Sequence, residues 1–161
     1  MKRTNKDTKE LMLDSNSLLD GIASDVEFTV APAQDIPIDP KKVTVIGSAP
    51  GTSFGIPIPI RTKIELVGQW KTSQNGTFVG PTGYPDRQIN GANVGAAIVM
   101  LQTFAIPLPP MEKHIYPEGG MEIPRSGFST AISILCNDDN FLDNETNPAD
   151  PIRAHLFFEN K

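Results

Sequence analysis

The chain has 161 residues, of which 39% are hydrophobic and 20% charged, and its formal net charge is −5. This length and composition are typical of a soluble globular protein with one domain and a substantial core. The acidic balance argues against nucleic-acid binding, which requires a basic surface, and no apolar run reaches the roughly 20 residues that span a bilayer.

The 15 prolines and 13 glycines exclude an all-helical fold, because proline removes a backbone donor and breaks helix interiors. They separate short β-branched runs, a pattern typical of a β-sandwich or barrel. The single cysteine, Cys136, excludes both an internal disulfide and a cysteine-based zinc cluster. We expect it to act as a small buried hydrophobic residue at a strand end.

The N-terminal region contains the one helical pattern, over residues 7–24. Its apolar face is formed at helical spacing by Leu11, Met12, Ser15, Leu18, Leu19 and Ile22. A helix this short is marginal in water, so we expect it to dock on its own domain or on another subunit. No signal-peptide pattern follows the basic first residues. The sequence therefore predicts an arm over residues 1–25 and a β-sandwich domain over residues 26–161.

Strand patterns follow in chain order. The first alternating run is residues 26–31, and a proline-rich, edge-like connection over 32–60 contains a strand within 41–48. The core strands are predicted at 62–70, 93–104, 127–136 and 152–159. The runs "AAIVML" and "AISIL" are nearly continuous and are expected to be buried on both faces. Residues 73–93, 107–127 and the acidic stretch that follows the strand ending at 136 are expected to form loops.

That acidic stretch, "CNDDNFLDNE" at 136–145, concentrates four carboxylates and three amides. Calcium takes six to eight oxygen ligands, and Asp138, Asp143 and Asn144 have suitable side chains, with Leu142 able to add a backbone carbonyl. The spacing is not that of an EF-hand. A solvated turn explains the same composition, so both interpretations stay open from the residues alone.

Catalytic patterns are weak. The two histidines, His114 and His155, lie in a proline-rich segment and a strand, and no serine lies in a nucleophile elbow. The glycines of "GSAPGTSFG" lack the lysine of a phosphate-binding loop. A carboxylate pair for glycoside hydrolysis is neither selected nor excluded. We therefore predict a protein that is not an enzyme, and we expect Trp70 to be a core or loop-anchoring residue.

The order of motifs resembles the PA-IL family of calcium-dependent galactose-binding lectins. The matching segments are "ELVGQW", "GPTG" at 80–83, "GAAIVM" at 95–100, "STAISILCND", "DN" at 143–144 and "AHLFF". The resemblance covers roughly residues 60–160. It implies an all-β fold, a galactose-binding-like β-sandwich of the jelly-roll kind, to which the N-terminal helix and arm would be added.

The resemblance also implies a site. Its calcium ligands would be the side chains of Asp138, Asp143 and Asn144 and the backbone carbonyls of Ser73 and Leu142. Two sugar hydroxyls would complete the coordination of Ca²⁺. The sugar-binding residues would be Asp86, Arg87, Gln88, Asn90 and Asp139. The histidine of the family's recognition loop is replaced here by Arg87 or Gln88, so a galactose preference does not follow.

The implied function is non-catalytic binding of a glycan or cell-surface polysaccharide through calcium. We expect a homo-oligomer that serves as an attachment component of a larger particle such as a phage virion, which is released by lysis and needs no signal peptide. The alternative is a purely structural virion subunit (tail, collar or capsid decoration) of the same fold, without sugar binding. In both cases residues 1–25 would dock into the assembly.

Overall fold

The computed structural model describes residues 27–46, 56–57, 61–123 and 129–160. Among these residues the regular structure is almost entirely β, with one short 3₁₀ helix, η1 (Phe141–Asp143). The strands are β1 (Gln34–Pro37), β2 (Thr44–Ile46), β3 (Ile56–Pro57), β4 (Thr62–Val67), β5 (Trp70–Lys71), β6 (Thr82–Ile89), β7 (Ala92–Thr103), β8 (Glu112–Ile115), β9 (Met121–Ile123), β10 (Ser129–Cys136), β11 (Glu145–Thr146) and β12 (Arg153–Phe158).

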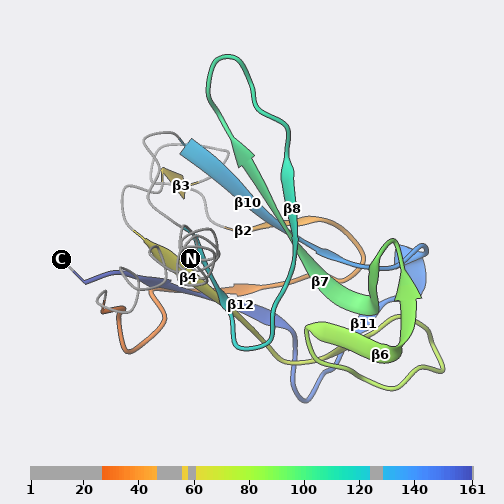
Figure 1. Cartoon of the computed structure of the whole chain (residues 1–161). Helices are drawn as coiled ribbons and strands as arrows, with labels where there is room; N and C mark the ends of the chain where they lie inside the picture. The colour runs from red at the N-terminus through yellow and green to blue at the C-terminus, as the bar shows by residue number, and fades with distance from the viewer. Residues whose placement is uncertain (1–26, 47–55, 58–60, 124–128, 161) are drawn as a thin grey trace, which may run out of the picture.

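The strands form antiparallel sheets in a sandwich-like arrangement (Figure 1). One sheet has the order β1-β12-β4-β9. The larger sheet has the order β2-β10-β7-β6, and β3 and β8 pair additionally with β10 and β7. A small third sheet joins β5 to β11. The predicted all-β, sandwich-like fold is therefore confirmed.

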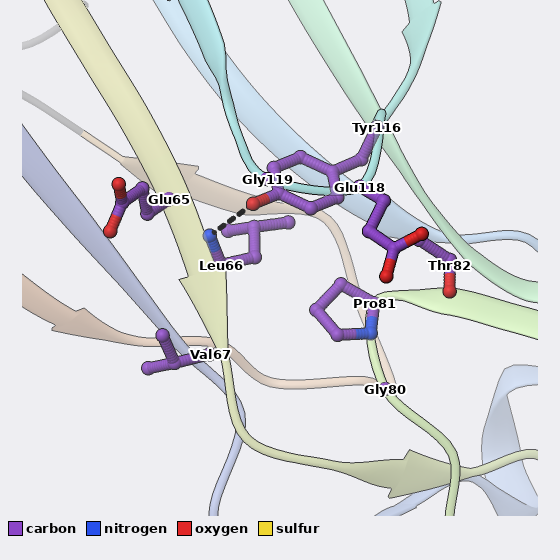
Figure 2. Close-up of a pocket in the computed structure, with 9 residues that line it drawn as sticks. All are labelled: Glu65, Leu66, Val67, Gly80, Pro81, Thr82, Tyr116, Glu118 and Gly119. Carbon is purple, nitrogen blue, oxygen red and sulfur yellow. Dashed lines mark hydrogen bonds between the residues drawn. The ribbon is translucent and has the colours of Figure 1, made fainter.

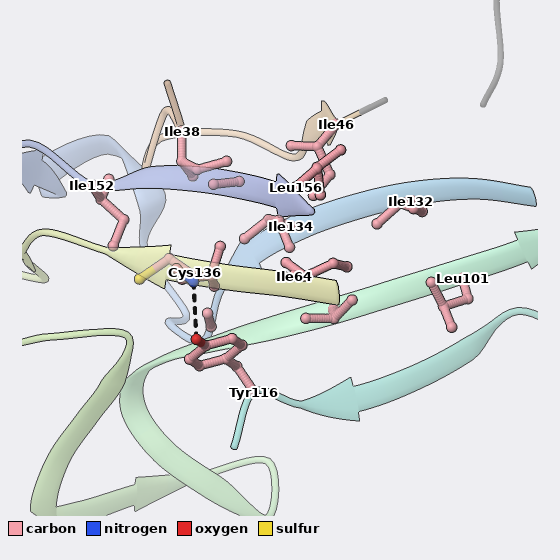
Figure 3. Close-up of a cluster of buried hydrophobic side chains, with 14 of the residues drawn as sticks. Ile38, Ile46, Ile64, Leu101, Tyr116, Ile132, Ile134, Cys136, Ile152 and Leu156 are labelled. Carbon is pink, nitrogen blue, oxygen red and sulfur yellow. Dashed lines mark hydrogen bonds between the residues drawn. The ribbon is translucent and has the colours of Figure 1, made fainter. Parts of the chain in front are cut away.

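The hydrophobic core is built from side chains of both large sheets (Figure 3). The first sheet contributes Ile64, Leu66, Ala154 and Leu156, and the second contributes Ile46, Val99, Leu101, Ile132, Ile134 and Cys136. Successive side chains of a strand point to opposite faces. The alternation predicted for the strand after residue 62 is confirmed, because the buried residues of β4 alternate with more exposed ones.

Trp70 closes one end of this core. Its side chain has no exposed surface, and its indole N–H donates a hydrogen bond of 2.7 Å to the carbonyl of Gly95. A buried indole N–H requires such a partner. The expectation that Trp70 is a core and loop-anchoring residue is confirmed.

Several predicted boundaries are wrong at the edges of the sheets. In the described part of the run predicted at 26–31, Phe28 makes an isolated bridge with Glu159, and the first strand of the described residues begins at Gln34. Residues 73–93 contain β6, and 107–127 contain β8 and β9. These strands lie at sheet edges, where solvent-facing polar residues and prolines obscure the hydrophobic alternation.

The expectation of burial on both faces is also wrong for "AISIL". Within β10, Ile132 and Ile134 are fully buried, whereas Ala131, Ser133 and Leu135 are only half-buried. One face of β10 therefore contacts the core and the other lies on the outside of the sheet. The helix predicted for residues 7–24 lies outside the described residues. Within the described part of the chain, no helix is long and apolar enough to cross a membrane.

Candidate functional site

The acidic loop, residues 137–144, follows β10 and lies at the end of the molecule where β6 meets β7 (Figure 1). Asn137 anchors its start by two backbone hydrogen bonds of 2.8 Å, one with Ala96 and one with Gly95. Asn140 then caps η1, since its side-chain oxygen accepts a hydrogen bond from the N–H of Leu142. The loop is therefore an ordered continuation of the sheet.

Three side-chain oxygens of this loop are buried without a hydrogen-bond partner. They are Oδ2 of Asp138, Oδ1 of Asp143 and Oδ1 of Asn144. Within the described residues only two other side-chain atoms share this property, the hydroxyls of Thr29 and Thr62. Each buried polar group left unsatisfied costs about 1–3 kcal/mol. Three unpartnered oxygens in one loop indicate that a bound group supplies positive charge or hydrogen-bond donors there.

Asn144 shows how the fold fixes one of these oxygens. The residue has no exposed surface, and its Nδ2 donates a hydrogen bond of 3.0 Å to the carbonyl of Pro40. Because only the NH₂ end of an amide can donate to a carbonyl, this bond determines which end of the side chain is the oxygen. The amide is therefore held in one orientation with its acceptor unpaired.

Asp138 is in an environment that disfavours its charge. Burial raises the pKa of its carboxyl above the ordinary value, although hydrogen bonds from the backbone of Asp139 and Asn140 lower it in part. One of these bonds joins the N–H of Asp139 to Oδ1 of Asp138 at 2.9 Å. The other carboxylate oxygen, Oδ2, is the unpartnered one. A cation at this oxygen would offset the cost of burying the charge.

The donor set fits a hard cation. Two carboxylates and one amide provide only oxygen ligands, which suits Ca²⁺ rather than a metal that prefers nitrogen or sulfur. In the described part of the chain, no group of three or more His, Cys, Asp or Glu side chains is placed to hold a metal ion. Calcium at this loop would therefore depend on the amide of Asn144 and on additional carbonyl or ligand oxygens.

Of the two predicted carbonyl ligands, one lies within the acidic loop and the other follows a strand that pairs beside it. Leu142 belongs to η1, and the residue is 82% exposed. Ser73 follows β5, which pairs with β11 directly after the acidic loop. Its carbonyl already accepts a hydrogen bond of 3.0 Å from Gly76, but a carbonyl has a second lone pair. At the same junction, the Lys71 ammonium lies 3.1 Å from the Glu145 carboxylate.

The predicted sugar-binding residues Asp86, Arg87 and Gln88 lie on β6 rather than in a free loop, which corrects that expectation. All three are exposed, and the pairing of β6 with β7 is irregular between Tyr84 and Gln88. The Arg87 guanidinium lies over the Tyr84 ring, 5.3 Å from its centre.

Asn90 lies in the hairpin turn that follows β6. It adopts a φ of 54°, and Gly91 beside it adopts 80°, as a two-residue turn between twisted strands requires. Asp139 is exposed on the acidic loop. The sugar candidates therefore occupy two separate segments, the β6–β7 hairpin and the acidic loop.

Asn137 joins these two segments and was not predicted as a site residue. Its buried Nδ2 lies 2.9 Å from the carbonyl of Ile89, 3.2 Å from that of Ala92 and 2.9 Å from that of Asn93. One side chain thus holds the hairpin turn against the start of the acidic loop. In the sequence, only the position of Asn137 directly after a hydrophobic strand indicates this role. Its hydrogen-bond partners are backbone atoms more than forty residues away, which no sequence pattern marks.

Cys136 precedes this loop and should be chemically inert in the folded protein. It is 1% exposed, and burial, with a contribution from Asp138, raises the pKa of its thiol to about 12. Because the thiolate is the reactive form, we expect no labelling by iodoacetamide at pH 7.5 and full labelling in urea. Mass spectrometry of both samples tests this, and rapid labelling of the native protein would contradict the buried position.

Another cavity of the described structure lies away from the acidic loop. Its volume is about 420 Å³, and it lies between the end of β4, the segment 80–82 and the turn at 116–119 (Figure 2). The hydroxyl of Tyr116 accepts a hydrogen bond of 2.9 Å from the N–H of Leu66, and the Glu118 carboxylate lies near Thr82 (Figure 2). None of the predicted site residues borders this cavity. We therefore place the candidate site at the acidic loop, where the unpartnered oxygens are.

The chain matches no protein-family model, no curated protein and no solved structure. The resemblance to the PA-IL lectins therefore stays a prediction from the order of motifs.

Proposed function

We propose that the acidic loop binds Ca²⁺ and that the protein is a non-catalytic, lectin-like module that recognises a glycan through this ion. The observation that carries the proposal is the set of three buried, unpartnered oxygens on Asp138, Asp143 and Asn144. These are the three side chains that the motif resemblance assigns as calcium ligands.

In this proposal the chain holds the ion and orients the sugar. Asp138 and Asp143 supply negative charge, and Asn144 supplies an acceptor whose orientation is fixed by Pro40. Calcium bound there would leave coordination positions for two adjacent hydroxyls of a sugar, since three side-chain ligands do not fill its shell. The exposed residues of the β6–β7 hairpin would contact further hydroxyls, and Asn137 would keep that hairpin in register with the loop.

The wider role that we propose is attachment of a larger particle, such as a virion, to a cell-surface polysaccharide. Residues 1–25, which would join the module to the particle or to further copies, lie outside the described residues. A purely structural subunit of the same fold is the competing hypothesis. It predicts that the acidic loop has no affinity for calcium.

Calorimetric titration of chelator-treated protein with calcium, alone and with a panel of simple sugars, tests the proposal. We expect saturable binding, a higher thermal midpoint and tighter calcium binding with one sugar, because hydroxyls and protein share the ion. Asp143→Ala should abolish all three effects while the far-ultraviolet circular dichroism persists.

Asp150→Ala is the matched control, since it removes an exposed carboxylate from the turn after β11 and should leave calcium binding intact. If the wild-type protein gives neither heat nor a change in midpoint, the acidic loop is a solvated turn and the lectin proposal is wrong.

A further inference from the structure

A second cavity borders the acidic loop on the outer face of the larger sheet. Its volume is about 340 Å³, and it is lined by residues of the β6–β7 turn, of β8, and of β7 and β10, and by Asn137. Ligand pockets for small molecules begin near 300 Å³. The cavity therefore has room for roughly one sugar ring.

The floor of this cavity is aliphatic. Leu135 pairs with Ile98, and Ile98 pairs with Ile115, so these side chains form a row across three strands. Leu135 and Ile98 are half-buried and Ile115 is 54% exposed, although Val99, the next residue of β7, is fully buried in the core. The row thus lies on the face of the sheet away from the core. The C–H face of a pyranose ring matches such a surface.

The rim of the cavity is polar and includes the ammonium group of Lys113. The side chain of Asn90 is exposed and makes no hydrogen bond within the described residues. Lys113 is exposed and, in the part of the chain that the structure describes, has no carboxylate within ion-pair distance. Its neighbour His114 borders the cavity as well, but Glu112 lies 3.2 Å from that imidazole. Lys113 is therefore available for an anionic group.

The cavity and the proposed calcium site share Asn137. This residue borders the cavity, begins the acidic loop and fixes the hairpin turn through three backbone carbonyls. Asp138, the first proposed calcium ligand, follows it directly. The cavity and the proposed calcium site are therefore adjacent, so that two linked sugar residues could occupy one each.

We propose that this cavity is a second sugar subsite, which takes a sugar residue bearing a carboxylate or sulfate next to the residue bound at the calcium loop. The inference rests on the proposed lectin function and names its ligand class, an acidic glycan. The ring packs on the row of aliphatic side chains, Asn90 contacts its hydroxyls, and Lys113 makes a charge-assisted hydrogen bond to the anionic group.

The test compares three oligosaccharides of equal length, one neutral, one containing a uronic acid and one sulfated, in excess calcium at low ionic strength. We expect the wild-type protein to bind an acidic oligosaccharide about tenfold more tightly than the neutral one, as one partly screened charged hydrogen bond provides. Lys113→Gln should remove this preference and leave calcium affinity unchanged, whereas Lys113→Arg should retain it. Comparison of the uronic acid and the sulfated oligosaccharide identifies which anionic group is preferred.

Two further variants separate the contribution of the cavity from that of overall charge. Lys42→Gln removes the same charge from an exposed position that does not border the cavity, so it should leave the preference intact. Asn90→Gly keeps a residue that tolerates the left-handed turn while it deletes the amide. It should weaken binding of every glycan that reaches the cavity without lowering the thermal midpoint.

Equal affinity for neutral and acidic oligosaccharides, or a preference that survives Lys113→Gln, would overturn the subsite and leave the calcium site standing. An equal loss in Lys42→Gln would also overturn it, because the attraction would then come from overall charge. Absence of both calcium and glycan binding in the wild-type protein would overturn the subsite together with the proposed function.

Discussion

Replacing Gly68 by alanine should destabilise the protein strongly. Gly68 connects β4 to β5 with a φ of +90°, and a Cβ there would lie 2.1 Å from the carbonyl oxygen of Pro151. The left-handed backbone alone costs a side chain about 1–2 kcal/mol. The contact with backbone atoms adds a further cost, because neither strand end can move aside cheaply. We expect a total loss of roughly 3 kcal/mol in the free energy of unfolding, measured by urea denaturation.

Gly91→Ala is the matched control. Gly91 has a φ of +80°, but an added Cβ would have no atom within 4 Å. This variant should lose only the conformational cost, about 1–2 kcal/mol. Equal losses in the two variants would show that Pro151 does not crowd Gly68. The comparison matters for the site, because the residue after Gly68, Gln69, hydrogen-bonds to both ends of the turn at 147–150, just after the acidic loop.

The strands of the sandwich were predictable where one face is buried. The residues of β4 alternate between core and solvent, and β12 brings Ala154 and Leu156 into the same core. By contrast, β6 contains Pro85 and four consecutive exposed residues, so no period of two is visible in its sequence. All four residues of β8 are exposed. These edge strands form because their backbones pair with β7, and the pattern of side chains in the sequence does not reveal that pairing.

The side chains of the candidate site were predictable from the sequence, but the hydrogen bonds that hold them in place were not. Asp138, Asp143 and Asn144 stand out as oxygen donors in one short stretch. The bond from Asn144 to Pro40, however, joins residues 104 positions apart, and the bonds of Asn137 end on backbone carbonyls of another hairpin. Such contacts depend on the tertiary arrangement and involve acceptors that every residue possesses. A sequence therefore indicates which side chains could bind a cation, whereas the fold determines which of their oxygens lack partners.

Asp138→Asn should stabilise the calcium-free protein at neutral pH and destabilise it relative to wild type once calcium is present. Burial raises the pKa of the Asp138 carboxyl, so ionisation is less favourable in the folded than in the unfolded chain. Below a pH of about 3.9, the pKa of an aspartate in the unfolded chain, Asp138 is protonated in both states and does not disfavour folding. As the pH rises through the higher pKa of the folded state, the buried carboxyl becomes charged and this stability is lost. Asparagine does not titrate. Without calcium, the thermal midpoint of the variant should exceed that of wild type at pH 7.5, and the difference should vanish in acid.

Calcium should make the thermal midpoint of wild type higher than that of Asp138→Asn, because the ion requires the ionised carboxylate that burial disfavours. At one hundred times the dissociation constant, a ligand that binds only the folded state stabilises it by about 2.7 kcal/mol, and Asp138→Asn should lose most of this gain. Wild-type calcium affinity should also rise with pH over the range in which Asp138 titrates, since a proton competes with the ion for that carboxylate. Thermal midpoints of both proteins, with calcium and with chelator across the pH range, provide the measurement. A solvated turn would give the same order of midpoints in both conditions, so only a cation site at Asp138 produces the crossing.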